Sequence, residues 1–329
     1  MRFLANPLFI GVRNARLVKG RLNNPFRRMI LGWAKQYADL LIDFMIMRSF
    51  LLSLFFFSPL SGEAKLSPEQ SSPEKMASEL GVKLPPRPWH LADVWWKFEK
   101  PVANFESLEV EVSIDRDMPD TYNLYVVPVG LARINGLDFY GGIQTNVNGW
   151  ISGKKRTPVV LDHVRKVDGG LCESAGCEGF FCSVRRPFKW GKGTCVFSMK
   201  KGSAKGGSTW FDCTVRSKDT GKTFDVGGLL FEGTDFSFWG NHSAFVEVYA
   251  TTKIPRSGIP KVKVAFGYPL LNGKKPKLAS ARAYHPSSGT AGSPACARVR
   301  GVGDKVEVEV GPIFRRDPAK TVHSLNLSP

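Results

Sequence analysis

Hydrophobic and polar residues alternate with a period of two in several short stretches of this chain. In residues 108–114, Leu, Val and Ile alternate with Glu and Ser, and in residues 306–310, Val alternates with Glu. A strand places successive side chains on opposite faces of its sheet, so each stretch predicts a strand with one buried face. Further strands are predicted at residues 122–132, 137–147, 179–186, 194–200, 208–216, 223–231, 243–252 and 261–268.

These elements follow one another without intervening helices, which predicts the fold class. Many short strands separated by turn residues favour an all-β, two-layer antiparallel β-sandwich or jelly roll over a βαβ fold. The 33 Gly and 22 Pro residues supply the turns. A chain of 329 residues with 43% hydrophobic content can bury one full-sized core. We therefore expect one main domain with tails.

Residues 47–64 have the three parts of a secretory signal peptide. Arg48 supplies the positive charge, residues 50–57 form a short apolar run, and Gly62, Glu63 and Ala64 make a small-x-small cleavage site. A signal anchor over residues 40–60 is the alternative, but Asp43 and Arg48 would each cost about 2.5–3.5 kcal/mol near the membrane centre. We expect cleavage after Ala64, which places the mature chain outside the cytoplasm: secreted, periplasmic or at the cell surface, without a stable transmembrane anchor.

The rest of the chain divides around this signal. Residues 1–46 precede it, so they are predicted to be a non-native or mis-assigned extension, with Met45 or Met47 as the true start; a long n-region is the alternative. Residues 65–88 are rich in Pro, Ser, Glu and Lys and predict a linker, with a short helix around residues 73–80. Residues 89–311 form the predicted β-sandwich domain, and residues 312–329 a flexible tail.

The formal net charge of the chain is +17 at pH 7. Such a surface attracts polyanions: acidic polysaccharide, anionic cell envelope or nucleic acid. Export makes nucleic acid an unexpected partner, so a polysaccharide or a cell-envelope glycan is the expected one. A surface that only keeps the protein soluble is the alternative.

Six cysteines lie after the predicted signal. An even number in an exported chain favours disulfides, and their spacing matches no common zinc motif, so no metal site is predicted. The Gly-rich residues 201–207 predict a hairpin loop centred on Ala204, which would set Cys195 opposite Cys213 and allow a disulfide. Two free thiols on one face are the alternative. The pairing of the other cysteines stays open.

The most informative stretch is the polar strand at residues 140–146. On a strand Tyr140, Gly142, Gln144 and Asn146 share one face, which becomes a row of hydrogen-bonding groups interrupted by a glycine. A missing side chain in a strand often marks the close approach of a ligand or of another backbone. Tyr, Gln and Asn suit sugar hydroxyls, although pairing with neighbouring strands would also use them. Two tryptophans, Trp150 and Trp190, are added as candidates for stacking against a sugar ring.

The Y-x-G-x-Q-x-N strand, Glu178-Gly179 downstream of it and the aromatic and basic residues 185–191 resemble an uncharacterised family of secreted bacterial proteins. The resemblance covers roughly residues 89–270. It implies a concanavalin-like jelly roll, similar to lectins and glucanases, in carbohydrate-related settings and with no established reaction. The cysteine cluster of this chain departs from the family pattern.

Together these features predict an exported, non-catalytic glycan-binding sandwich, with acidic polysaccharide as the favoured ligand and no cofactor. The alternative is a polysaccharide lyase or another carbohydrate-active enzyme working from the same face, with Tyr140 or His163 as base and Gln144, Asn146 or Arg133 neutralising the substrate carboxylate. Whether the chain is an enzyme therefore stays open.

Two groups of carboxylates are further candidates for a site. Glu109 and Glu111 approach the paired acids of a glycosidase, but their strand position favours a solvated face. A loop with Asp115, Asp117 and Asp120 fits either a calcium site or a turn.

Overall fold

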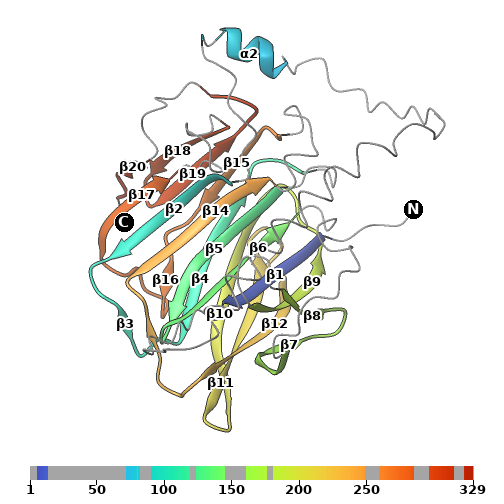
Figure 1. The fold of residues 1–329 in the computed structure, drawn as a ribbon, viewed down its shortest axis with the longest axis vertical. Helices are drawn as coiled ribbons and strands as arrows, with labels where there is room; N and C mark the ends of the chain where they lie inside the picture. Colours follow the sequence, from blue (N-terminus) through green and yellow to red (C-terminus); the bar gives the residue numbers. More distant parts are fainter. Residues whose placement is uncertain are drawn as a thin grey trace, which may run out of the picture. The chain divides into compact units, whose positions relative to one another are not determined.

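The computed structural model describes residues 6–13, 72–79, 81, 90–118, 124–144, 161–175, 181–248, 259–284, 296–314 and 322–328. Apart from two short helical segments, α2 (Pro73–Glu79) and the 3-10 turn η2 (Leu161–His163), the regular structure of these residues is β-strand. The strands form two antiparallel sheets that pack face to face (Figure 1). The predicted all-β, two-layer sandwich of jelly-roll type is confirmed.

Sheet A contains eleven of the described strands, in the main order β20-β17-β2-β14-β5-β6-β1-β9-β8, with β3 and β13 beside it. Its strands are β1 (Asn6–Arg13), β2 (His90–Phe98), β3 (Val102–Ala103), β5 (Leu124–Ile134), β6 (Leu137–Gln144), β8 (Leu171–Ala175), β9 (Phe181–Phe188), β13 (Ser237–Phe238), β14 (Asn241–Val248), β17 (Leu278–Tyr284) and β20 (Val322–Leu325).

Sheet B contains nine described strands, in the order β18-β19-β15-β4-β10-β11-β12-β7, with β16 paired to β4. Its strands are β4 (Ser107–Ile114), β7 (Val164–Lys166), β10 (Gly193–Lys205), β11 (Ser208–Ser217), β12 (Thr223–Glu232), β15 (Val262–Phe266), β16 (Leu270–Leu271), β18 (Ala297–Val302) and β19 (Lys305–Val310). All ten stretches that the sequence predicts as strands contain a strand of the structure.

Some elements lie where no strand was predicted. Strand β1 falls in the stretch 1–46 and β20 in the predicted tail 312–329, so sheet A takes in residues from outside the predicted domain 89–311. The helix expected around residues 73–80 is present as α2, whose first turn is capped by the Ser72 Oγ accepting the Lys75 N–H at 3.1 Å. No helix within the described part of the chain is long and apolar enough to cross a membrane.

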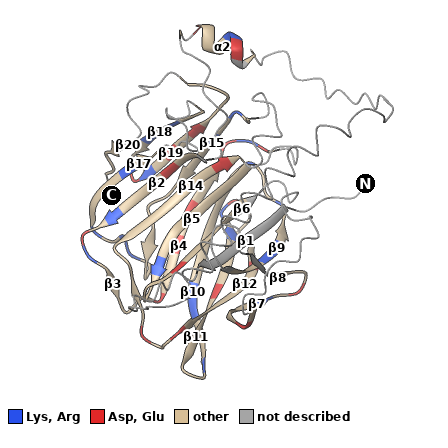
Figure 2. Cartoon of the chain, viewed as in Figure 1, with Lys and Arg blue, Asp and Glu red and all other residues tan. Residues whose placement is uncertain are grey.

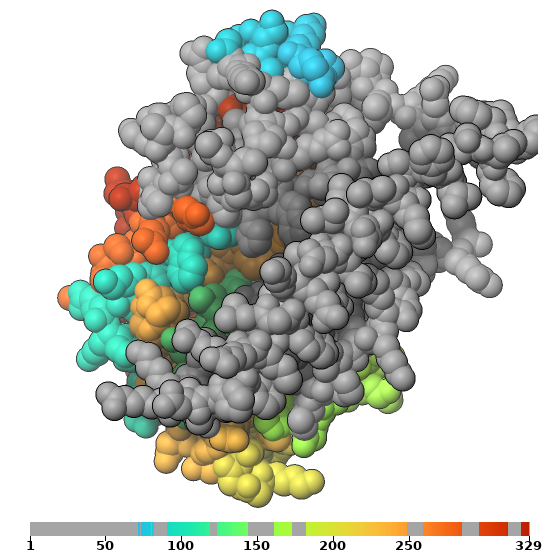
Figure 3. Space-filling view, viewed as in Figure 1, coloured from blue at the N-terminus to red at the C-terminus, as the bar shows by residue number. Residues whose placement is uncertain are grey.

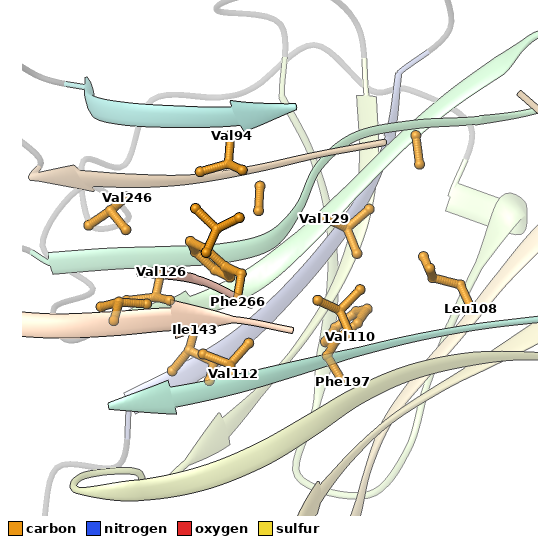
Figure 4. Packing of buried hydrophobic residues seen from close by; sticks show 14 of the residues in the cluster. Val94, Leu108, Val110, Val112, Val126, Val129, Ile143, Phe197, Val246 and Phe266 are labelled. Carbon is orange, nitrogen blue, oxygen red and sulfur yellow. The ribbon is translucent and has the colours of Figure 1, made fainter. Parts of the chain in front are cut away.

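The core lies between the two sheets, where the inward-facing side chains of each meet those of the other. In Figure 4 valines and isoleucine from β2, β14, β5 and β6 approach the apolar side chains of β4, β10 and β15. The burial of β4 alternates residue by residue, with its Val110 and Val112 almost fully buried. Since each buried aliphatic side chain contributes about 1.5–3 kcal/mol, this contact is the main source of stability.

Charged residues on the outward side of sheet B form ion pairs, some between adjacent strands and some across an intervening strand. Figure 2 shows where acidic and basic residues lie along the strands. Glu111 illustrates the pattern: burial acts to raise its pKa, but hydrogen bonds from two lysines outweigh it and lower the pKa, keeping the carboxylate ionised. The cross-strand pairs are Arg298–Glu309, Arg300–Glu307, Lys305–Glu111 and Lys218–Glu111.

An asparagine joins two distant turns beside β4. Asn272 has a left-handed backbone (φ 51°), and its Oδ1 accepts the backbone N–H groups of Glu106 at 2.7 Å and Ser107 at 3.1 Å. Its Nδ2 donates to the Asn104 carbonyl at 2.8 Å. One amide thus ties the start of β4 to the turn after β16.

The hairpin β10–β11 is present, but its predicted register is wrong. Strand β10 continues to Lys205, and the turn is the pair Gly206-Gly207, both with positive φ, as a type I′ turn requires. Moving the turn from Ala204 shifts the register, so Cys213 lies opposite Met199 and Cys195 opposite Ser217. Both cysteines are free thiols on the inner side of sheet B, and burial raises the pKa of each. The predicted Cys195–Cys213 disulfide is therefore excluded by the register.

A histidine is buried in the core between the sheets. His242 is fully inaccessible, its Nε2 donates to the Pro128 carbonyl at 2.9 Å, and its ring lies 5.6 Å from that of Trp96. A carbonyl only accepts, so the Nε2 carries the proton of a neutral ring. Burial lowers the pKa of His242 from 6.5 to about 4, against the opposing effect of the hydrogen bond.

Peptide mapping without reductant should find no crosslink between the Cys195 and Cys213 peptides. Because Cys213 is 1% exposed, we expect its thiol to react with an alkylating reagent only after unfolding, whereas the half-buried Cys195 reacts sooner. A native Cys195–Cys213 crosslink would mean that the observed register does not hold in solution.

The stability of the fold should depend on pH through His242. Above pH 6.5 its ring is neutral in both states, but between pH 6.5 and about 4 the unfolded chain takes up a proton that the folded chain does not. The free energy of unfolding should therefore fall by about 1.4 kcal/mol per pH unit across this range because of His242. Urea unfolding of the native chain and of His242→Gln at several pH values isolates the contribution of His242, because the carboxylates titrate in both proteins. If the free energy of unfolding depended on pH equally in the two proteins, the assigned role of His242 would be contradicted.

Candidate functional site

Tyr140, the first residue of the predicted polar strand, lies on the outward face of sheet A. It packs with Phe245 of β14 against two buried residues of β5, Tyr125 and Val127, in an apolar cluster separate from the main core. The rings of Tyr125 and Phe245 meet edge to face, with centroids 5.8 Å apart. Tyr140 and Phe245 remain partly exposed. We call these four residues the aromatic cluster.

The register of sheet A continues this face toward β2 and β17. Trp95 lies opposite Ser243 on one side and Arg282 on the other, and Asp93 lies opposite Phe245 and Tyr284. The Arg282 guanidinium is 6.0 Å from the centre of the Trp95 ring. In Figure 3 atoms of β2 (teal) and β17 (orange) lie at the surface. The face therefore combines aromatic rings with charged and hydroxyl groups on five consecutive strands of the sheet, from β17 to β6.

Near the start of β6, the side chain of Arg133, which belongs to β5, is engaged by two neighbouring side chains. Its Nε donates to the Asp138 Oδ1 at 2.6 Å, and its guanidinium lies 4.7 Å over the ring of Trp239. Asp138 shares the face of Tyr140, because the two are separated by one residue on the strand. The lyase alternative uses the positive charge of Arg133 to neutralise a substrate carboxylate, but in the structure Asp138 balances that charge.

The glycine of the polar strand has a structural cause. A Cβ at Gly142 would lie 2.5 Å from the Val126 carbonyl oxygen and 2.8 Å from the Val127 Cα. Strand β5 is irregular between Val126 and Val129, and its backbone occupies this space. Of the two explanations for a missing side chain, the close approach of a neighbouring backbone applies.

Gln144 ends β6 and pairs with Tyr125, but its side chain, Asn146 and Trp150 lie outside the described residues. Trp190 follows β9 and packs against the main core, not against the aromatic cluster. His163 lies in η2, which packs near β7, β8, β9 and β12, and its Nε2 is 4.0 Å from Asp162. The structure thus brings Arg133 and Tyr140 onto one face and places Trp190 and His163 elsewhere.

Three carboxylates outside this face, Glu111, Asp115 and Asp117, have structural partners. Glu111 holds Lys218 and Lys305, Asp115 accepts the Lys263 N–H at 2.8 Å, and Asp117 accepts the Lys192 N–H at 2.7 Å. These contacts match the turn interpretation of the aspartate loop; Asp120 is not among the described residues. Within the ranges that the structure describes, no three His, Cys, Asp or Glu residues lie close enough to hold a metal ion.

Two aromatic residues of this face, Phe245 and Trp95, were not predicted from the sequence. Phe245 stands between the buried Ala244 and Val246, and Trp95 between the buried Val94 and Trp96, so each is an aromatic residue at an outward position. That signal is visible in the sequence once the strand is known. That both share a face with Tyr140, and that Phe245 packs near it, is not visible, because this depends on the order in which β2, β14, β5 and β6 pair.

A scan against family models found no match for this sequence, and a search of curated proteins found none. Among solved structures, a crystal structure of scytalido-glutamic peptidase with a transition-state analogue inhibitor aligns with 9% identity. The alignment covers 68% of this chain and 98% of the peptidase, with a TM-score of 0.30. A TM-score this low supports no shared function.

Replacing Gly142 by Ala should destabilise the fold by about 1–3 kcal/mol, because the new methyl group would overlap the backbone of β5. Gly240→Ala is the matched control: the nearest atoms to its Cβ lie at 3.7 Å, so we expect a change within about 0.5 kcal/mol. Chemical unfolding of both variants tests this. Equal stabilities would show that β5 does not constrain residue 142.

Proposed function

We propose that this protein binds a polysaccharide or cell-envelope glycan through the outward face of sheet A, without a chemical reaction. The observation that carries the proposal is the aromatic cluster, in which Tyr140 and Phe245 are partly exposed on a rigid sheet. Trp95 extends the same face by way of β14.

The chemistry of this face suits a sugar ring, which has an apolar C–H surface edged by hydroxyl groups. Aromatic side chains provide large apolar area with limited conformational entropy, and a few polar groups fix the orientation of a ligand. Around Trp95, Asp93 can accept hydrogen bonds and Arg282 can donate them. Their strands hold these groups more rigidly than loops would.

An acidic glycan is the favoured ligand. The chain after the predicted cleavage site keeps a net charge of +11, which raises the local concentration of polyanions at the surface, and Arg282 lies beside the partly exposed ring of Trp95. A carboxylate-bearing sugar would meet both an aromatic ring and a guanidinium there. The proposal includes export, which rests on the pattern of residues 47–64, outside the described ranges.

Binding is preferred to lyase chemistry because Arg133, the positive group of the lyase alternative on this face, is already paired with an acid. Arg133 is paired with Asp138, and His163 lies near β8 and β9, while Tyr140 packs in the aromatic cluster. A lyase needs a base and a neutralising cation at one sugar residue.

Affinity measurements on a panel of acidic and neutral polysaccharides test the proposal. Tyr140→Ala and Trp95→Ala should each weaken binding by about tenfold or more, the effect expected of a central aromatic contact. Trp210→Ala, which removes a tryptophan that contacts Arg165 on sheet B, serves as the control and should bind as the native chain does. Tyr140→Phe separates the loss of the hydroxyl from the loss of the ring.

Retention that is unaffected by Tyr140→Ala and Trp95→Ala, or no retention on any polysaccharide, would contradict the proposed site. Release of unsaturated products during the incubation would instead assign the face to a lyase.

A further inference from the structure

Strand β1 (Asn6–Arg13) lies inside sheet A, with a partner on each side. It pairs antiparallel with β6 from Leu8 to Arg13 and with β9 along its whole length. In the strand order β6 and β9 are neighbours of β1 and not of each other. Among the described strands, β1 is thus what joins β8 and β9 to the rest of sheet A (Figure 1).

The two strands that flank β1 are each held in place by other parts of the fold. Strand β6 pairs with β5, while β9 pairs with β8 and also packs against β7 and β12 of sheet B. The two edges that face β1 are therefore supported without it. We call the space between them the β1 slot.

The sequence of β1 fits the β1 slot in one register. Leu8, Ile10 and Val12 occupy positions opposite core residues of β6 and β9: Ile143, Val184, Phe139 and Cys182. A shift by one residue would move these three apolar positions to the other face.

The small and proline residues of β1 restrict the register further. Gly11 lies opposite Tyr140 on one side and Ser183 on the other, so no Cβ stands between them. Pro7 is opposite Pro187. Neither proline can donate a hydrogen bond, so the pair suits only a non-hydrogen-bonded position of the ladder.

The covalent link from β1 to the next described residue, Ser72, runs through residues 14–71. Cleavage at any peptide bond within residues 14–71 would cut that link and leave β1 held by strand pairing alone. An unfilled slot would then leave two strand edges with unpaired N–H and C=O groups inside sheet A, which is costly and prone to aggregation.

We propose that the β1 slot is a strand-binding site that holds residues 6–13 whether or not they remain covalently attached to the sandwich. Backbone hydrogen bonds to both edges supply affinity, as in strand addition at a sheet edge, and the register positions of Leu8, Ile10 and Val12 supply selectivity. The ligand class is an extended segment with this alternating pattern. The proposal is independent of glycan binding.

The test uses the full chain with a recognition site for a sequence-specific protease inserted after Gln70. Hydrogen exchange on the uncut protein first checks that β6 and β9 are protected as in the native chain. After cleavage, the fragment that carries residues 6–13 should co-elute with the sandwich in size-exclusion chromatography and separate only in denaturant. A synthetic peptide of residues 4–15 should displace it, and the same peptide with Ile10→Pro should compete at least about tenfold less well, because it loses an N–H donor and leaves a neighbouring carbonyl unpaired.

Two full-chain variants assign the retention to β1. Ile10→Pro should release the fragment after the cut, while Lys19→Pro, a proline in the same fragment outside β1, should retain it. Release of the native fragment in buffer, or its retention by Ile10→Pro, would overturn the proposal.

Discussion

The burial of inward-facing side chains between the two sheets is the constraint on which the rest of this structure depends. Each strand must present its apolar positions to the same side as its neighbours, because a shift of one residue would turn them toward solvent. Val110 and Val112 of sheet B and Val126 and Val246 of sheet A satisfy this condition together (Figure 4). The outward positions of the same strands are then free to differ between the sheets.

The two outward faces use that freedom in different ways. On sheet B, acids and bases pair directly across β18 and β19, and Lys305 of β19 reaches Glu111 of β4, so that the charges within these pairs cancel. On sheet A, aromatic side chains occupy outward positions of β2, β5, β6 and β14. A face of paired charges has most of its donors and acceptors satisfied. Partly exposed aromatic rings, in contrast, are stabilised when a ligand covers their apolar surface. This contrast, more than any single residue, directs attention to sheet A.

The sequence predicts those strands whose alternation is regular, such as β4 and β19, and their sandwich class. It misses β2, because the adjacent Trp95 and Trp96 hide the change of face, and β17, where small alanines take the inward positions. The register of β10–β11 fails for another reason: a run of polar and glycine residues does not show which two of them make the turn. Tyr140 is found from its polar strand, but Phe245 joins it through pairing between distant segments, which no local pattern reveals.

The hydrogen bonds of the Asn272 side chain also affect the chemical stability of this asparagine. Asn272 is followed by Gly273, and in an unfolded chain the unhindered glycine nitrogen can attack the asparagine side-chain carbonyl carbon and expel ammonia, closing a cyclic imide that water then opens to an acid. In the fold, both ends of that amide are engaged, by the Glu106 and Ser107 N–H groups and by the Asn104 carbonyl. A carboxylate there would set an oxygen against the carbonyl in place of a donor. The same three hydrogen bonds that join the two turns therefore hold the amide away from attack, and the lifetime of this linkage is tied to the persistence of the fold.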